Sequence, residues 1–228
     1  MPNWCNTRME ITGHEEDVKR FINSVKVEDV EEDIYDYSTS YPYEKTGSRI
    51  VQRTEIIKSF IPIPEELYSV MVPIREEQAE LAQRMKEKYG STDWHSWQYE
   101  NWGVKWGDCH TELDDEGDDT DAKGNHVAVY RFDTAWGTAT KAFLKISAMF
   151  PDLRFDFFHV EEGGFFQGSE VIKNGKLVYE RFFSPSDYPV PFPDEDSEDA
   201  RDKWSEDHDE WCFQIQMEID DEVDAVIA

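Results

Sequence analysis

The chain has 228 residues, 39% hydrophobic and 14% aromatic, so it can bury a core as one large domain or two small ones. Its formal net charge of −28 makes direct binding to nucleic acid or anionic membranes unfavourable, and no apolar run approaches the ~20 residues needed to cross a bilayer. Three widely spaced cysteines and no basic-then-apolar leader lead us to expect free thiols and a cytoplasmic location.

The negative charge is concentrated in three segments. Residues 28–36 carry six acids, residues 108–121 carry eight, and residues 194–228 carry fifteen acids with two bases. These segments hold 27 of the 28 excess negative charges, so the remaining surface is nearly balanced. Such segments are usually solvated loops or tails, and some are interaction surfaces for basic partners.

Five elements are expected in the first half of the chain. They are a strand over 4–11, a helix ending at Val25, an irregular insertion over 28–48, a strand over 54–61 and a polar helix over 73–89. Alternating apolar residues indicate the first strand, and residues 12–15 have the spacing of a capping box that would start the first helix. Pro62 should end the second strand, and Gly90 should end the second helix as its C′ residue.

The second half of the chain begins with the acidic segment 108–121, which we expect to be a loop. The elements expected after it are a strand over 126–132, a helix over 139–150, a strand over 153–157, and a hairpin of strands 165–172 and 177–183. Asn174 and Gly175 tolerate the positive φ of a type I′ turn, so they predict the hairpin. Residues 184–197 form a spacer, and residues 212–219 could be one more strand or a loosely held docking segment.

Two β-α-β halves predict an α+β protein with a ferredoxin-like antiparallel sheet and helices on one face. The C-terminal hairpin and a helical insertion at about 62–125 extend this plan. We expect the domain to span 1–183 and an acidic, aromatic-containing tail to span 184–228.

Several stretches resemble one protein family. They are residues 1–6, 11–13, 61–67, 100–106 and 132–136, which occur here as MPNWCN, ITG, IPIPEEL, ENWGVKW and FDTAW. In this order they resemble the YubB family of phage- and plasmid-encoded proteins over roughly residues 1–183. The resemblance implies a ferredoxin-like fold and a mobile-element setting, near genes that protect incoming DNA, but no particular activity.

Four tryptophans and a tyrosine lie within thirteen residues that end at Trp106. One interpretation is a ligand pocket in which Trp102, Trp106 and Trp136 offer flat rings, Lys105 binds an anionic group, and Asp133 adds a polar contact. The other is an aromatic lid that buries the open end of the sheet. No glycine-rich phosphate loop or acid–base pair accompanies the cluster, which favours the lid.

Catalytic and metal-binding patterns are weak. Asp133 and His159 flank the second strand–helix–strand unit, but no Ser or Cys lies in a nucleophile-elbow sequence, and we expect Cys5 to be buried. His208 and Cys212 are four residues apart and lack the further ligands that structural zinc requires. We therefore expect no enzyme activity, no cofactor and no metal.

The leading functional hypothesis is a non-enzymatic protein that contacts a basic, nucleic-acid-binding host partner, as a DNA mimic or counter-defence factor. Aromatic residues in the acidic tail support it, because a purely solvating tail has little need for them. The expected contact residues are Asp114, Asp115, Glu116, Asp118, Asp119, Trp204, Asp207, Asp209, Glu210 and Trp211. Mimicry requires the three acidic segments to meet on one face. The alternatives are the ligand pocket and an accessory subunit that dimerises through a sheet edge; the sequence does not set the oligomeric state.

Overall fold

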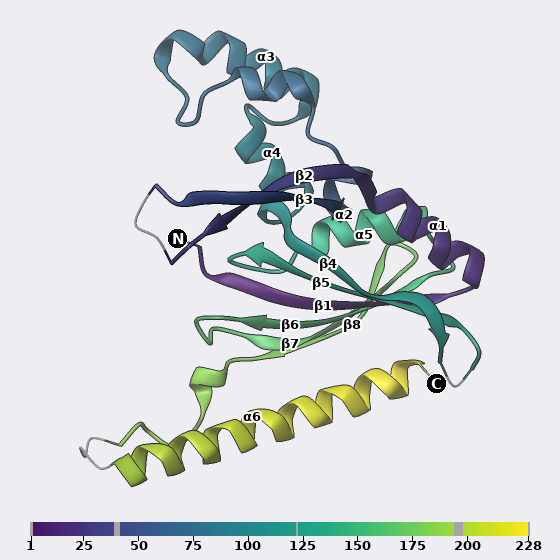
Figure 1. Ribbon diagram of the computed structural model, residues 1–228, viewed down its shortest axis with the longest axis vertical. Coiled ribbons are helices and arrows are strands. Elements are labelled where there is room, and N and C mark those ends of the chain that lie inside the picture. Colours follow the sequence, from purple (N-terminus) through teal and green to yellow (C-terminus); the bar gives the residue numbers. More distant parts are fainter. Residues whose placement is uncertain (1, 39–41, 122, 194–197, 228) are drawn as a thin grey trace.

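A six-stranded sheet runs through the centre of the molecule (Figure 1). The computed structural model describes residues 2–38, 42–121, 123–193 and 198–227, and the side chains of 28–30, 32, 51, 52, 115–119, 198 and 227 lie outside that description. The strands are β1 (Trp4–Gly13), β4 (Lys105–Thr120), β5 (His126–Ala135), β6 (Arg154–Glu161), β7 (Gln167–Lys173) and β8 (Lys176–Phe183). Their order is β4-β5-β1-β6-β7-β8, with every neighbouring pair antiparallel, so the ferredoxin-like prediction is confirmed.

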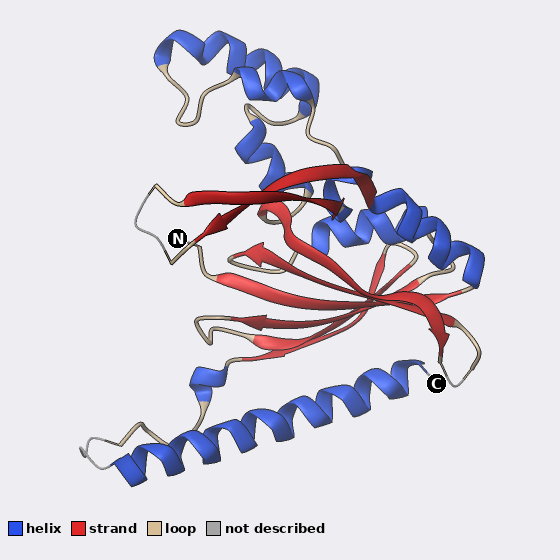
Figure 2. Ribbon diagram, viewed as in Figure 1, coloured by secondary structure: helices blue, strands red, loops and turns tan. Residues whose placement is uncertain are grey.

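Two helices, α1 (Glu15–Val25) and α5 (Thr140–Met149), cover one face of the sheet (Figure 2). Phe21 of α1 lies at the centre of this layer, where its ring packs edge-to-face on Tyr130, Phe150 and Phe155 at centroid distances of 6.0, 5.3 and 5.6 Å. Burial of one such ring contributes about 1.5–3 kcal/mol. The helical periodicity in the sequence therefore located the core correctly.

The hairpin between β7 and β8 forms as predicted. Asn174 and Gly175 adopt φ values of 48° and 71°, the left-handed conformation that a type I′ turn requires at both central positions. The predicted capping box is wrong. Thr12 lies inside β1 with its hydroxyl buried, and His14 precedes the helix without a side-chain cap.

The expected insertion at 28–48 is instead part of a second, two-stranded sheet formed by β2 (Lys26–Asp36) and β3 (Glu44–Thr54). The strand expected over 54–61 is also wrong, because Ile56–Phe60 forms the short helix α2. Asp108, far away in the sequence, accepts hydrogen bonds from the backbone N–H groups of Ile56 and Ile57 at 2.9 and 2.8 Å. This carboxylate satisfies the first turn of the helix and overrides the local β propensity.

The acidic segment 108–121 is almost entirely in β4 rather than in a loop. Its register against β5 shifts at four places, so the strand is repeatedly bulged. Because β4 is an edge strand, charged side chains on it can reach solvent while the backbone pairs with β5. Clustered charge therefore did not distinguish a loop from an edge strand.

Residues between β3 and β4 form the helical insertion. Its elements after α2 are η1 (Glu65–Ser69), η2 (Glu76–Gln78), α3 (Ala79–Tyr89) and α4 (Trp94–Asn101). The helix expected over 73–89 begins later, at Ala79, and ends at Gly90 with a φ of 80°, as predicted. Asp93 caps α4 by accepting a 2.9 Å hydrogen bond from the backbone N–H of Ser96.

The tail folds, after η3 (Pro185–Asp187), into one long helix, α6 (Glu198–Ile227), so the strand considered for 212–219 is wrong. Glu170 of β7 accepts a hydrogen bond from Thr140 of α5, whereas its neighbour Ser169 accepts one from Gln216 of α6. Adjacent strand residues point to opposite faces, so α6 covers the face opposite α5 (Figure 1). The expectation of helices on one face alone is corrected accordingly.

Ile219 anchors α6, because its side chain is completely buried. Arg181 of β8 forms ion pairs with Glu218 and Glu222 at 3.0 and 2.5 Å. The length of α6 does not make it a membrane span: in the part of the chain that the structure describes, no helix combines the length and apolar character needed to cross a bilayer.

Candidate functional site

The start of β4 departs from regular strand geometry. Register shifts separate Lys105 from Cys109 and Cys109 from Glu112, and within these bulges Trp106 and His110 have φ values of 72° and 52°. Trp136, just after β5, has a φ of 63°. A bulky side chain in the left-handed region costs on the order of 1–2 kcal/mol, and such positions gather at functional sites.

Three tryptophans meet at this strained region, and we call Trp4, Trp106 and Trp136 the aromatic platform. The ring of Trp106 lies 6.2 Å from Trp4 and 6.0 Å from Trp136. The backbone N–H of Trp136 donates to the carbonyl of Asn3 at 2.9 Å, which holds the end of β5 against the start of β1. Trp136 remains 50% exposed, so part of the platform faces solvent.

A cation lies over the platform. The Lys105 Nζ atom is 4.1 Å from the ring centroid of Trp106 and 5.9 Å from that of Trp136. These distances are typical of cation–π contacts, which are worth about 0.5–1 kcal/mol at an exposed site. The platform thus combines flat apolar faces with one fixed positive charge.

A chain of three polar side chains borders the platform. Asn6 donates to Asp133 Oδ1 at 2.6 Å, and Asp133 Oδ2 lies 2.9 Å from His110 Nδ1. The His110 ring also makes an edge contact with Trp4, at a centroid distance of 5.5 Å. Asp133 therefore orients a largely exposed imidazole, whose Nε2 atom is available to a ligand.

An open groove of about 500 Å³ continues from the platform across the sheet. It lies on the same face as α6, in the part that this helix leaves open. Its lining includes Asn6, Arg8, His110, Arg131, Asp133 and Phe158. Small-molecule sites commonly have volumes of about 300–1,000 Å³. The platform and this groove together have the dimensions and mixed polarity of a binding site.

Of the five residues predicted for a pocket, the structure brings four together: Lys105, Trp106, Asp133 and Trp136. Trp102 lies elsewhere. It is completely buried, its indole N–H donates to the carbonyl of Ile61 at 3.0 Å, and α4 ends before it, so it shares no helix face with Trp106. The aromatic-lid interpretation is therefore correct for Trp102.

Sequence reasoning missed three members of the site, Trp4, Asn6 and His110. Trp4 and Asn6 do fall on the polar side of the alternating pattern in the first strand, which was a usable signal. No sequence signal marked His110, because its position depends on bulges in β4.

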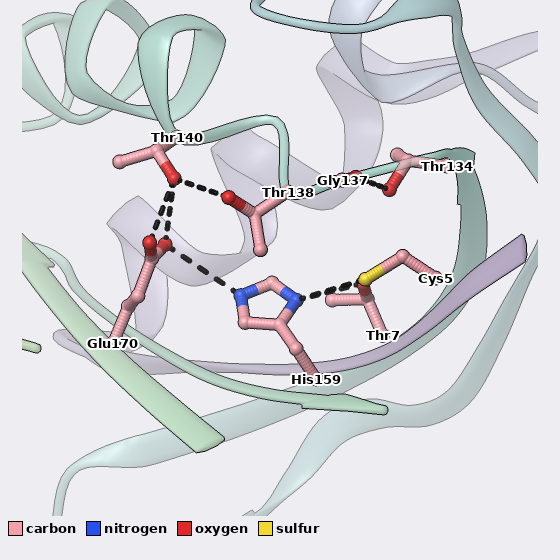
Figure 3. Close-up of polar contacts among 8 residues, drawn as sticks. All are labelled: Cys5, Thr7, Thr134, Gly137, Thr138, Thr140, His159 and Glu170. Carbon is pink, nitrogen blue, oxygen red and sulfur yellow. Dashed lines mark hydrogen bonds and ion pairs between the residues drawn. The ribbon is translucent and has the colours of Figure 1, made fainter. Parts of the chain in front are cut away.

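A second polar cluster is buried on the face of the sheet that α1 and α5 cover (Figure 3). His159 Nδ1 is 2.9 Å from Thr7 Oγ1 and 3.8 Å from the sulfur of Cys5, and Nε2 lies 3.5 Å from Glu170 Oε2. The Thr140 hydroxyl donates to the same carboxylate at 2.7 Å. Cys5, His159 and Glu170 have the composition of a nucleophile–base–acid trio. All of the clustered residues except Thr140 are at most 3% exposed, so a substrate has no access to them.

Burial raises the pKa of the Cys5 thiol to about 11, so Cys5 stays protonated at neutral pH and is a poor nucleophile. The expectation that Cys5 is buried is confirmed. Asp133 and His159 do not form a catalytic pair, because they bond to Asn6 and Thr7, adjacent residues of β1 that point to opposite faces. The buried cluster therefore holds α5 and the sheet together.

The three acidic segments do not form one face. Residues of β2 lie in the hairpin beside β4, whereas α6 lies on the other side of the sheet (Figure 1). Asp114 is paired with Arg131 at 2.5 Å. The side chains of the other β4 candidates, Asp115, Glu116, Asp118 and Asp119, lie outside the described part of the structure.

The two tryptophans expected to contact a partner instead pack against this chain, Trp211 on the domain and Trp204 on the spacer of the tail. Trp204 donates its indole N–H to the carbonyl of Val190 at 2.8 Å, and the Trp211 ring packs on Phe183 at 5.9 Å. The acidic candidates Asp207, Asp209 and Glu210 are exposed. Trp211 thus helps to dock the tail on its own sheet, whereas Trp204 stabilises the spacer that precedes α6.

Residues 102–187 match a family model described as the ferredoxin-like domain in Api92-like protein. A crystal structure of a protein api92 from Yersinia pseudotuberculosis is 13% identical to this chain, with a match that covers 84% of this chain and 99% of that chain and has a TM-score of 0.41. No curated protein matches the sequence.

The part that resembles the Api92-like domain runs from the start of β4 to η3. It contains five members of the site: Lys105, Trp106, His110, Asp133 and Trp136. Trp4 and Asn6 come from β1, outside the matched residues. The site is thus assembled where the matched segment meets the first strand.

Proposed function

We propose that this protein is a binding protein, and that the aromatic platform stacks a planar ligand. One observation carries the proposal: Trp106, His110 and Trp136 all have left-handed backbones and meet at one partly exposed surface. They account for three of the four non-glycine residues with positive φ in the described chain, and the fourth lies in the β7–β8 turn. Strain of this kind persists when it positions side chains for a task.

The chemistry of the site supports a ligand that combines an aromatic ring with an anionic group. Trp136 offers an exposed ring face, and stacking on such a face is worth about 1–3 kcal/mol. Lys105 places a positive charge beside two of the rings, and His110 adds a hydrogen-bonding atom. An external cation is disfavoured here, because Lys105 already occupies the cation–π position.

A ligand screen tests this proposal. Calorimetry with nucleosides, nucleotides and aromatic carboxylates should find at least one ligand, and Trp136→Ala should weaken its binding by about 5- to 100-fold. Phe213→Ala is the matched control, since it removes an exposed aromatic ring of α6 that does not line the groove, and it should leave binding unchanged. Absence of any ligand, or equal binding by Trp136→Ala, would overturn the proposal.

Protein–protein contact through α6 is a second candidate, with its own supporting observation. Phe213 and Met217 are 62% and 47% exposed on one face of α6, and Asp209 and Glu210 lie one helical turn before them on the same face. Apolar side chains beside acids suit a basic amphipathic segment of a partner. In the mobile-element setting that a YubB-like protein would have, the partner would be a basic host protein that binds nucleic acid.

This second candidate no longer requires mimicry of duplex DNA by three converging segments, because α6 alone would make the contact. Co-precipitation from host lysate should recover a basic partner whose retention falls with salt and is lost in Phe213→Ser. Trp136→Ala should retain that partner. A capture that is indifferent to both salt and Phe213→Ser would count against this candidate.

A further inference from the structure

Helix α6 lies along the sheet (Figure 1), and its two long flanks have different surroundings. On the flank toward β8, the carboxylate of Glu222 lies 2.5 Å from Arg181 and accepts a 2.8 Å hydrogen bond from the Tyr179 hydroxyl. Residues two positions apart on a helix point in nearly opposite directions, so Asp220 and Asp224 lie on the other flank, toward the middle of the sheet. The ion pairs of Arg181 therefore hold α6 along one flank.

A gap of about 210 Å³ lies beneath the second flank. Its charged lining consists of Arg8, Glu10, Arg154, Asp156, Glu170, Asp220 and Asp224. Arg8 is paired with Glu10 at 3.0 Å. Arg154 is paired with Asp156 at 2.6 Å. Asp220 and Asp224 therefore bring two carboxylates into a gap whose two bases already have acidic partners.

Asp156 lacks part of the solvation that a carboxylate needs. Its Oδ2 atom accepts a hydrogen bond from Arg154, whereas its Oδ1 atom is buried and has no hydrogen-bond partner among the described residues. Burial raises the pKa of this carboxyl to about 6, the two arginines of the gap oppose the rise, and Glu10 adds to it. Glu170 takes no part, because it bonds to Thr140 on the other face of the sheet. The ionised form of Asp156 is therefore disfavoured where α6 covers it.

The gap adjoins the groove that starts at the aromatic platform. Arg8 and Phe158 belong to the lining of both. The gap lies under α6, and the groove lies on the part of the same sheet face that the helix leaves open. The flank with Asp220 and Asp224 therefore separates the two, and movement of this flank away from the sheet joins the gap to the groove.

We propose that the C-terminal half of α6 is a proton-controlled cover of the sheet. It docks while the Asp156 carboxyl is neutral, and it lifts when Asp156 ionises, because Asp220 and Asp224 then face a further negative charge across the gap. Lifting lengthens the groove along β6 and exposes more of the sheet to a ligand. The inference rests on the gap and not on the function proposed for the platform.

The direction of the pH dependence follows from the two positions of the helix. An exposed aspartate has a pKa of about 3.9, so lifting α6 lowers the pKa of Asp156 from about 6 toward that value. The docked position therefore favours the neutral carboxyl, and docking is strongest below about pH 4 and weakens as the pH rises through about 6. Each unit of pKa corresponds to a tenfold change in the docking equilibrium, so the full range is up to about 100-fold.

Hydrogen exchange of the full chain at fixed ionic strength tests this inference, because a lifted helix loses the packing that keeps its amides protected. Each observed rate is compared with the intrinsic rate at the same pH to give a protection factor. From pH 5 to pH 7, protection of residues 216–226 should fall by about 5- to 10-fold, and Asp156→Asn should abolish this fall. Asp221→Asn is the control, since it removes an acid of α6 that does not line the gap, and it should leave the fall unchanged.

A second variant acts from the side of the helix. Asp220→Asn/Asp224→Asn removes the two charges that oppose the ionised Asp156, so protection of residues 216–226 at pH 7 should rise by about 2- to 5-fold. Unchanged protection in this variant would mean that the charges of the second flank do not oppose docking, and the proposal would be wrong.

Two further results would overturn the proposal. An equal fall in the wild type and in Asp156→Asn would show that the ionisation of Asp156 is independent of α6. Exchange of residues 216–226 only together with β1 would show that the helix opens only when the whole domain unfolds. No ligand enters the experiment, so either result leaves the aromatic platform to be judged by its own test.

Discussion

Asp156 is a largely but not fully buried acid on β6 that lowers the stability of the fold at neutral pH. Burial raises its pKa from 3.8 to about 6, with Glu10 adding to the rise and Arg154, whose Nε lies 2.6 Å away, opposing it. One carboxylate oxygen has no hydrogen-bond partner among the described residues. Because the folded state favours the neutral Asp156 carboxyl, the stability that this neutral form provides is fully present below about pH 4. That stability is lost as the pH rises through about 6, where the folded carboxyl ionises.

Asp156→Asn should therefore increase the free energy of unfolding at pH 7 by about 3 kcal/mol, at ~1.4 kcal/mol for each unit of pKa. The gain should shrink to roughly half by pH 5, where the folded wild-type side chain is protonated. Urea unfolding at both pH values measures it, with exposed Asp152→Asn as the control. An equal gain at both pH values would show that packing, not ionisation, is responsible.

The strain at His110 gives a second prediction for a single residue. His110 has a φ of 52°, whereas Glu112, two residues along β4, does not have a positive φ. Glycine relieves left-handed strain but loses more backbone entropy on folding. His110→Gly should therefore be less destabilising than Glu112→Gly, by about 1–2 kcal/mol in urea unfolding, while it weakens ligand binding. The reverse order of stability would remove the strain argument.

At the level of elements, α6 is a cover that docks through a few side chains. Ile219 is fully buried, whereas the ion pairs of Arg181 with Glu218 and Glu222 are partly exposed and worth roughly 0–1 kcal/mol each. Apolar contact therefore dominates the docking of the helix. This is why a segment with twelve acids still folds onto the sheet.

Ile219→Ala should weaken that docking by about 2–5 kcal/mol and increase hydrogen exchange in residues 198–227. Exchange in β1 and β5 should stay slow, because their core lies on the other face. Met217→Ala, two residues away and 47% exposed, should change neither. Simultaneous loss of protection in β1 would show that α6 is needed for the whole fold.

The elements differ in how well local patterns predicted them. Helices α1 and α5, strand β1 and the β7–β8 hairpin follow from periodicity and from the Asn174–Gly175 turn, because each of these signals lies within the element itself. Helix α2 and strand β4 were missed for the opposite reason. The cap of α2 comes from Asp108, and β4 exists because β5 pairs with it.

At the scale of the whole molecule, the formal net charge is −28, and two of the acidic segments, β2 and α6, lie on different sides of the sheet (Figure 1). Self-repulsion of such a charge opposes the compact state, and salt screens it. The thermal midpoint should therefore rise between 20 and 200 mM NaCl, by about 2–4 °C for each kcal/mol of repulsion relieved. Differential scanning calorimetry measures this, and a falling midpoint would mean that attractive ion pairs outweigh the repulsion.

The amino-acid order alone was enough for the ferredoxin-like plan, the core face of α1 and α5, and the positions of the acidic segments. These features depend on periodicity and composition, which are local properties of the chain. The faces that the acids occupy, the burial of Trp102, and the meeting of Trp4, His110 and Trp136 were decided by the folded sheet. They depend on bulges in β4 and on strand pairing over more than a hundred residues, which no short stretch of sequence contains.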